Sequence, residues 1–400
     1  MRGFRYLLGL LIILAACWLG VWWYAEGRMQ NGVTAWAEQL ATQGWKVSYD
    51  RLQRGTSPAA ATLTLTNLVL SPPADSHGET GAVTLPVVAL RIELLDPMVL
   101  HTDLPQKISV AVGQTINAVV SFGSVALDQE LDPHVLFHSG AFPYRSGSFN
   151  AAGVDILASD GSLLVLHLDS IATHYAFDPD AGADRMAFTG TEQLNGVAIS
   201  PLVARLLSIP FGGKVASLSL NLGLSGPVPP DLAALAARIN AIPASDEADR
   251  QKLFVPVVHD WAAKGGNGNF GLGAVVGPTT LASDGALKFD ANLQPQGTAD
   301  VTADHLDEFT QAVTNAYPET QAVITAWQAQ LSAYITSTPL GGQSLAMHVA
   351  YGDGAVNVNG TKTSDLPPID WTALENPAPV LAPTPTPPPV TGDGANTPTP

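Results

Sequence analysis

The chain offers two clusters of residues with the types that bind metal ions. His134 and His138 are four positions apart, which suits two ligands on one helical face, but the Val-Leu-Phe run between them favours an extended chain. A second cluster suggests a calcium loop: Asp178, Asp180 and Asp184. That loop lacks the glycine at its sixth position and the closing glutamate that calcium loops carry. We therefore predict no metal site, and we interpret the aspartates as a solvated turn.

Two further clusters have residue types used in phosphate binding and in acid–base catalysis. Gly212-Gly213-Lys214 lacks the upstream glycine and the following Ser or Thr of a phosphate-binding loop. Asp304, Asp307 and Glu308 equally suit the first turn of a helix, where carboxylates complement the helix dipole, and we favour that interpretation. Nucleophile-elbow and zinc-protease motifs are missing from the sequence. We expect no catalytic residue, no cofactor and no enzymatic activity, although a triad assembled from distant segments stays open.

Composition limits the partners that this chain can have. The 400 residues contain 18 Lys and Arg against 35 Asp and Glu, a formal net charge of −17. Such an acidic chain is a poor candidate for binding nucleic acid or for broad adhesion to anionic lipid headgroups. Only 13% of the residues are charged whereas 46% are hydrophobic, so the chain is unusually apolar for its charge.

Residues 6–24 form an uncharged apolar run that decides where the rest of the chain is located. As a helix its nineteen residues extend roughly 28 Å, close to the hydrocarbon thickness of a bilayer. Arg2 and Arg5 precede it, which keeps residues 1–5 cytoplasmic. Aromatic side chains suited to the membrane interface gather at its far end: Trp18, Trp22, Trp23 and Tyr24. We predict an uncleaved signal anchor in the bacterial inner membrane, single-pass, with the bulk of the chain in the periplasm.

A lipoprotein is the alternative interpretation of the same run. Residues 14–17 read Leu-Ala-Ala-Cys, a lipoprotein cleavage box, and Cys17 is the only cysteine. However, the apolar run continues through Tyr24, where a lipoprotein has a polar tether. We favour the anchor, and both alternatives place the bulk of the chain outside the cytoplasm. A single cysteine excludes an intramolecular disulfide.

After the anchor the hydrophobic pattern changes from helical to extended. A stripe with spacings of four, three and four predicts an amphipathic juxtamembrane helix over residues 25–44: Met29, Val33, Trp36 and Leu40. From residue 45 apolar and polar residues alternate in many segments, most clearly over residues 217–224. Strands with one apolar and one polar face indicate a large curved antiparallel sheet. A glycine-rich loop is expected over 265–273 and a hairpin turn at Asp284-Gly285.

Helical spacing returns in two segments of the remaining chain, near residues 230–264 and 304–336. We expect these helices to cover the apolar face of the sheet, which gives an α+β periplasmic domain over residues 45–375. Residues 376–400 consist mainly of Pro, Thr, Ala and Gly and predict a disordered tail.

Turn residues and alternating segments along nearly the whole chain resemble one bacterial family. They are Trp22-Trp23-Tyr24, Trp36, Gly44-Trp45, Ser48-Tyr49, Asn67, Gly285-Ala286-Leu287, Pro295, Gly297, Asp353-Gly354 and Leu366-Pro367-Pro368-Ile369. The sequence resembles the domain-of-unknown-function 2125 family, although Gly55-Thr56-Ser57-Pro58 replaces that family's usual Gly-aromatic-Pro. The resemblance implies an envelope protein of Gram-negative bacteria without a known activity. More distantly the chain is similar to AsmA-like envelope proteins, which are associated with lipid handling.

Two functional hypotheses follow for this domain. In the first it is a structural or partner-binding module of the cell envelope, attached to the inner membrane by its N-terminal helix. In the second the apolar face of the sheet forms a groove for a lipid acyl chain, since the strands carry small and medium aliphatic residues. The side chains expected to face such a lipid are Leu63, Leu65, Leu218, Leu220 and Leu222.

Overall fold

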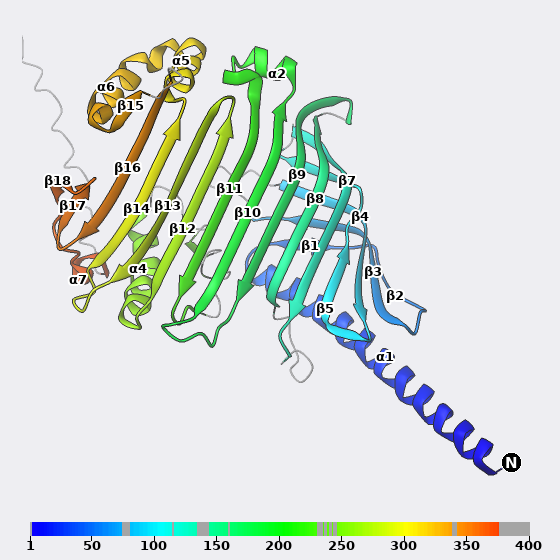
Figure 1. Ribbon diagram of the computed structural model, residues 1–400. Coiled ribbons are helices and arrows are strands. Elements are labelled where there is room, and N and C mark those ends of the chain that lie inside the picture. Colours follow the sequence, from blue (N-terminus) through cyan, green and yellow to red (C-terminus); the bar gives the residue numbers. More distant parts are fainter. Residues whose placement is uncertain are drawn as a thin grey trace, which may run out of the picture.

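Within the residues that the structure describes, one antiparallel sheet of 18 strands dominates the fold (Figure 1). The computed structural model describes residues 2–73, 81–113, 116–133, 144–158, 161–229, 246–337 and 342–375, with residues 235, 238, 239 and 242. A large antiparallel sheet with a few helices confirms the predicted α+β class. His134 and His138, most of the segment 230–245 and the tail 376–400 lie outside the described residues.

The first part of the sheet contains two places where a pair of short strands shares one neighbour. Both β1 and β2 pair with the same side of β3, and both β5 and β6 lie between β4 and β7. The remaining strands pair in chain order. The strands of this part are β1 Lys46–Ser48, β2 Arg51–Arg54, β3 Ala60–Ser71, β4 Gly81–Glu93, β5 Asp96–Asp103, β6 Lys107–Val112, β7 Ile116–Leu131, β8 Tyr144–Ala158 and β9 Leu163–Phe177.

The second part continues as a meander, in which each strand from β9 to β14 pairs with the next. Then β14 pairs with one side of β16, while β15 and β17 pair with the other side. The strands of this part are β10 Met186–Ile199, β11 Lys214–Ser225, β12 Asn267–Val276, β13 Thr279–Phe289, β14 Pro295–Asp304, β15 Ile335–Ser337, β16 Gln343–Gly352, β17 Ala355–Val358 and β18 Thr361–Asp365.

The helices differ in where they lie on the sheet. The helix α1 runs along its β1–β4 end and extends beyond it, whereas α5 and α6 stand beside β15 and β16 (Figure 1). The α-helices are α1 Arg2–Thr42, α2 Pro201–Leu206, α4 Glu247–Ala263, α5 Leu306–Ala316, α6 Gln321–Leu331 and α7 Trp371–Glu375; the 3₁₀ turns are η3 Pro210–Gly213, η4 Pro318–Thr320 and η5 Ser332–Tyr334. Within the described part of the chain, none of the helices is long and apolar enough to cross a membrane.

One face of the sheet is apolar along nearly its whole width. Residues directly opposite each other on paired strands project to the same side, so the registers define rows that cross the sheet. One such row is Leu63, Leu90, Thr102, Leu127, Phe149, Thr173, Glu192, Leu220, Leu272, Ser283, Val301 and Met347. The face that α1 covers at β3 is therefore the same face that β11 and β12 present further along.

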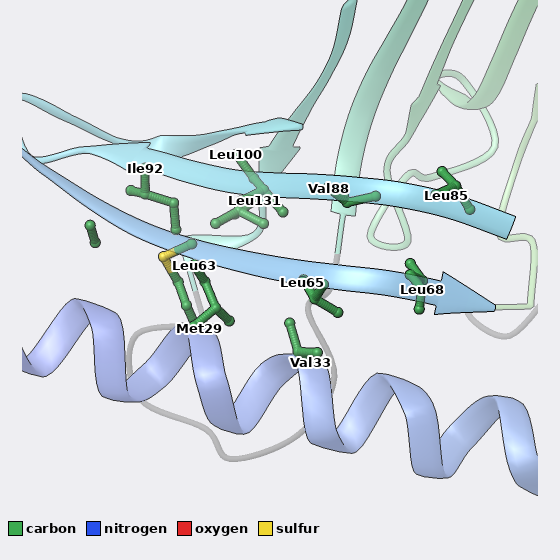
Figure 2. Close-up of a cluster of buried hydrophobic side chains, with 11 residues drawn as sticks. Met29, Val33, Leu63, Leu65, Leu68, Leu85, Val88, Ile92, Leu100 and Leu131 are labelled. Atoms are coloured by element: carbon green, nitrogen blue, oxygen red, sulfur yellow. The ribbon is translucent and has the colours of Figure 1, made fainter. Parts of the chain in front are cut away.

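The core of the domain lies where α1 packs on this face. Met29 and Val33, one turn apart on α1, contact leucines of β3 and β4 in a cluster of buried side chains (Figure 2). Leu63 has no exposed surface and Leu65 has 2%. The predicted helical stripe thus packs against the predicted strand face, as both periodicities require.

Two turns expected from glycine are strands in the structure. The expected loop over 265–273 contains most of β12, and Asp284-Gly285 lies in the middle of β13. A Cβ atom on Gly285 would lie 2.6 Å from the Phe270 ring and 2.7 Å from the carbonyl oxygen of Thr298. The glycine is therefore needed for the close approach of neighbouring strands, and the hairpin prediction was wrong because it took that glycine for a turn residue.

Candidate functional site

The acidic and glycine-rich clusters have local structural roles. Arg185 bonds to the carbonyl oxygen of Asp180 at 2.8 Å and pairs with the Asp178 carboxylate at 3.2 Å, which closes the acidic turn. Gly213 is buried, and a Cβ atom there would lie 2.8 Å from the Ile199 side chain. Its neighbour Lys214 begins β11. These contacts give both clusters a role in packing and turn formation.

The three carboxylates at the start of α5 bind to three different groups. Asp304 accepts a hydrogen bond from the Ser344 hydroxyl at 2.7 Å and precedes His305, the N-cap residue of α5. Asp307 accepts one from the backbone N–H of Gln343 at 2.9 Å, and this bond lowers the pKa of its carboxyl group. Glu308 lies 3.1 Å from the ring of His305. The three groups are thus used to attach α5 to β16 and to its own first turn.

A long apolar hollow, here called the trough, lies on the apolar face where strands β10 to β16 cross it. Its cavity volume is about 650 Å³. Trp327 of α6 is among its lining residues. Leucines from adjacent strands line its floor: Leu194, Leu218, Leu220, Leu272 and Leu281. Among the residues that the structure describes, Glu192 is the only charged one that lines it. The trough can therefore hold a ligand by apolar burial and offers few polar groups to orient it.

The trough exists because the helices cover only parts of this face. At one end α1 covers β3 and β4, and elsewhere Trp261 of α4 and Leu224 of β11 pack in one hydrophobic cluster. Between them Leu220 is 40% exposed and Leu272 is 50% exposed. The described helices thus leave the middle of this face exposed. Most of the segment 230–245, which was expected to add cover, lies outside the described residues, so that part of the expectation stays a prediction.

The five leucines expected to face a lipid fall into two environments. Leu218, Leu220 and Leu222 project from β11 toward the trough side, and Leu222 is exposed like its neighbour Leu220. Leu63 and Leu65 instead lie beneath α1, where Leu65 lines a second cavity of about 300 Å³. Tyr144 also lines that second cavity, and burial raises the pKa of its phenol group.

Several lining residues were not singled out from the sequence. Leu272 lies in the segment 265–273 that was expected to be a loop, Leu281 belongs to a strand with ordinary alternation, and Trp327 belongs to a helix expected to face the core. The signal that unites them is the register, which places Leu272 opposite Leu220. Register between distant strands cannot be read from one sequence, so the trough could not be assembled from it.

The four aromatic residues expected at the membrane interface also divide into two pairs. The indole N–H of Trp18 donates a hydrogen bond to the carbonyl oxygen of Pro58 at 2.6 Å, and that of Trp22 donates to Ala60 at 3.3 Å. Trp23 and Tyr24 are exposed on the helix surface. One pair thus holds α1 to the segment that joins β2 and β3, and the other pair points to the surroundings.

Comparison with known proteins assigns this chain to a family. No curated protein matches this chain, and no solved structure matches it. The distant similarity to AsmA-like proteins therefore stays a prediction. One family model matches residues 22–367, most of the chain; it is domain of unknown function 2125, an uncharacterized protein conserved in bacteria. The resemblance inferred from turn residues and alternation is confirmed, and this chain belongs to that family.

Proposed function

We propose that this protein is a periplasmic binding module, anchored in the bacterial inner membrane, that holds an acyl chain in the trough. The observation that carries the proposal is the trough itself, an uncovered apolar hollow of about 650 Å³. Pockets that bind small molecules span about 300–1,000 Å³ and are mainly apolar. Large exposed apolar patches on a soluble surface mark sites of interaction.

The chemistry of the lining favours a hydrocarbon chain over a polar metabolite. Leu220, Leu272 and Trp327 leave apolar surface exposed that a ligand would remove from water, at a gain of about 25 cal/mol per Å². Polar metabolites need several convergent donors and acceptors, and within the described part of the chain the charged lining of this trough is limited to Glu192. A carboxylate disfavours an anionic headgroup beside it, so the headgroup would lie away from Glu192.

The N-terminal sequence supports the proposed location. Residues 6–24 contain no charge and follow Arg2 and Arg5, the pattern of a signal anchor whose amino terminus stays in the cytoplasm. Attachment to the inner membrane would keep the trough beside a source of lipid. In this proposal α1 is both the anchor and the cover of the core.

Lipid analysis of the full-length protein, purified in detergent, tests the proposal. We expect about one phospholipid or fatty acid per chain, and displacement by a fluorescent fatty acid. Leu220→Gln and Leu272→Gln should reduce retention several-fold. Asn221→Gln, on the same strand as Leu220 but on the opposite face, is the matched control. A folded protein that carries no lipid and binds no acyl probe would rule the function out.

A second candidate, a partner-binding module, is favoured by one separate surface. The short helix α2 and the residue after it expose three leucines: Leu202, Leu206 and Leu207. Leu206 is 80% exposed, which is typical of a protein contact when such residues cluster. If α2 binds an envelope protein, Leu202→Ser with Leu206→Ser should abolish an in-cell crosslink at α2 and leave the lipid content unchanged.

A further inference from the structure

We propose that two adjoining turns of the sheet, residues 55–59 and residues 94–95, rest in the lipid headgroup layer beside α1. The β2–β3 turn and the β4–β5 turn would then hold the sheet by one end against the bilayer. This inference rests on the anchor part of the proposed function. It concerns a contact with the bilayer surface, which is independent of whether the trough holds an acyl chain.

The first observation is the depth at which the β2–β3 turn meets α1. Trp18 and Trp22, which hydrogen-bond to Pro58 and Ala60, both lie inside the apolar run of residues 6–24. Trp18 precedes the end of that run by six residues, which is about 9 Å along a helix. The headgroup region on each side of a bilayer is about 5–8 Å thick. A turn attached at Trp18 is therefore held at least as deep as the headgroup layer when the run spans the membrane.

The second observation is that α1 is fixed to the sheet over several turns. Arg54 donates two hydrogen bonds to the side-chain oxygen of Gln30, at 3.1 and 2.6 Å. Glu26 is buried between α1 and the sheet, and desolvation raises the pKa of its carboxyl group. One turn further on, Met29 is fully buried against β3. The helix is thus part of the domain, and its angle in the bilayer also sets the orientation of the sheet.

The third observation is the composition of the two turns. Residues 55–59 read Gly-Thr-Ser-Pro-Ala, with no charge, and residues 56–59 are exposed. Leu95 in the adjoining turn is 87% exposed, more than any other large hydrophobic residue described. The backbone N–H of Leu94 bonds to the carbonyl oxygen of Ala59 at 3.4 Å, which joins the two turns. An uncharged tip with an exposed leucine suits the membrane interface better than water.

Charged residues stand behind the tip on the strands. Arg51 and Arg54 are the first and last residues of β2, and Arg91 pairs with Glu93 on β4. Arginines at this level can bind lipid phosphates, whereas Asp96 after Leu95 opposes an anionic surface. The contact would therefore be shallow, with the apolar tip between headgroups and the arginines at their outer edge.

Spin-label accessibility in the full-length protein tests this contact. Cys17 is replaced by Ser, and nitroxides are attached at Ser57→Cys and Leu95→Cys in liposomes of phosphatidylethanolamine and phosphatidylglycerol. Asn292→Cys, in the exposed β13–β14 turn, is the water control. Ile13→Cys, in the apolar run, is the bilayer control. We expect collisions of the Ser57 and Leu95 labels with a water-soluble nickel complex to be several-fold fewer than those of the Asn292 label.

The controls separate the two proposals. If the Ile13 label is protected in lipid while the Ser57 and Leu95 labels match Asn292, the inference fails and the anchor stands. If the Ile13 label is equally open to nickel, the anchor fails and the inference with it. Trp18→Phe supplies a second measurement that does not alter either turn. Removing the indole donor to Pro58 should raise nickel access at Ser57, and unchanged access would contradict the proposed role of Trp18.

Discussion

Two regions of one apolar sheet face differ in how far helices cover them: the covered end at β3 and β4, and the open middle at β11 and β12. At β3 the leucines lie under α1, and Leu63 has no exposed surface. At β11 and β12 the same rows of the same face leave Leu220 40% and Leu272 50% exposed. The strands have the same alternation in both places, so the difference comes from the helix that lies above one of them. Tertiary cover, and not strand sequence, decides which part is core and which part is a candidate site.

The largest expected effect comes from shortening a leucine at the covered end. Leu63→Ala removes side-chain volume from a site with no exposed surface, so it should lower the free energy of unfolding by about 2–5 kcal/mol. Leu220→Ala is the matched change in the open middle, and it should lower the free energy of unfolding by less than about 1 kcal/mol. Urea denaturation followed by circular dichroism measures both. Equal losses of unfolding free energy would mean that helices cover the two regions equally.

A smaller loss is expected where close strand approach shapes the floor beside the trough. A Cβ atom on Gly285 would meet the Phe270 ring at 2.6 Å and backbone at 2.7 Å, so Gly285→Ala should cost about 1–3 kcal/mol. Gly27→Ala in α1 is the control, because nothing lies within 4 Å of a Cβ there. That change should be neutral or stabilise the helix by up to about 1 kcal/mol. Thermal unfolding of the two variants distinguishes these outcomes, and an equally stable Gly285 variant would contradict the close packing of β12 on β13.

Polar substitution in the open middle should weaken ligand binding without a large loss of stability. Leu272→Gln exchanges a half-exposed leucine of the trough, so the loss of folding free energy should stay below about 1 kcal/mol. Titration with a fluorescent fatty acid should nevertheless give a several-fold weaker affinity. The sharper comparison is Val88→Gln at the covered end, which should destabilise the fold. A Leu272 variant with unchanged affinity would remove this part of the trough from the proposed site.

The smallest effect is expected on the polar face of the sheet. His167 lies 2.6 Å from Asp155 and 3.2 Å from Asp169, and the hydrogen bond to Asp155 raises the pKa of the imidazole. A raised folded-state pKa means stabilisation that is complete below the ordinary value of about 6.5 and is lost as pH rises through the folded value. Because His167 is partly exposed, the effect should be below about 1 kcal/mol. Relative to His167→Gln, the native protein should gain stability from pH 8 to pH 5.5.

Much of the fold could be predicted because its strands repeat the same simple signal. The alternation over residues 217–224 indicates the strand β11, and the stripe of Met29 and Val33 indicates the face of α1 that packs in the structure. The errors arose at glycine, where Gly285 suggested a turn and instead allows Phe270 to approach. They arose also from cover, because strand alternation does not reveal which stretch of a face a helix will reach. The trough depends on that second kind of information, so the sequence indicated two of its lining leucines, Leu218 and Leu220, and not its shape.

Crosslinking with a photoactivatable fatty acid tests the central claim most directly. The full-length protein would be irradiated with the probe, digested, and mapped by mass spectrometry to individual strands. We predict adducts on β11 and β12, over residues 214–225 and 267–276, and few on β3 and β4 beneath α1. Adducts spread equally over the covered end and the open middle, or confined to β3 and β4, would contradict the claim that the uncovered middle of the apolar face is the binding site.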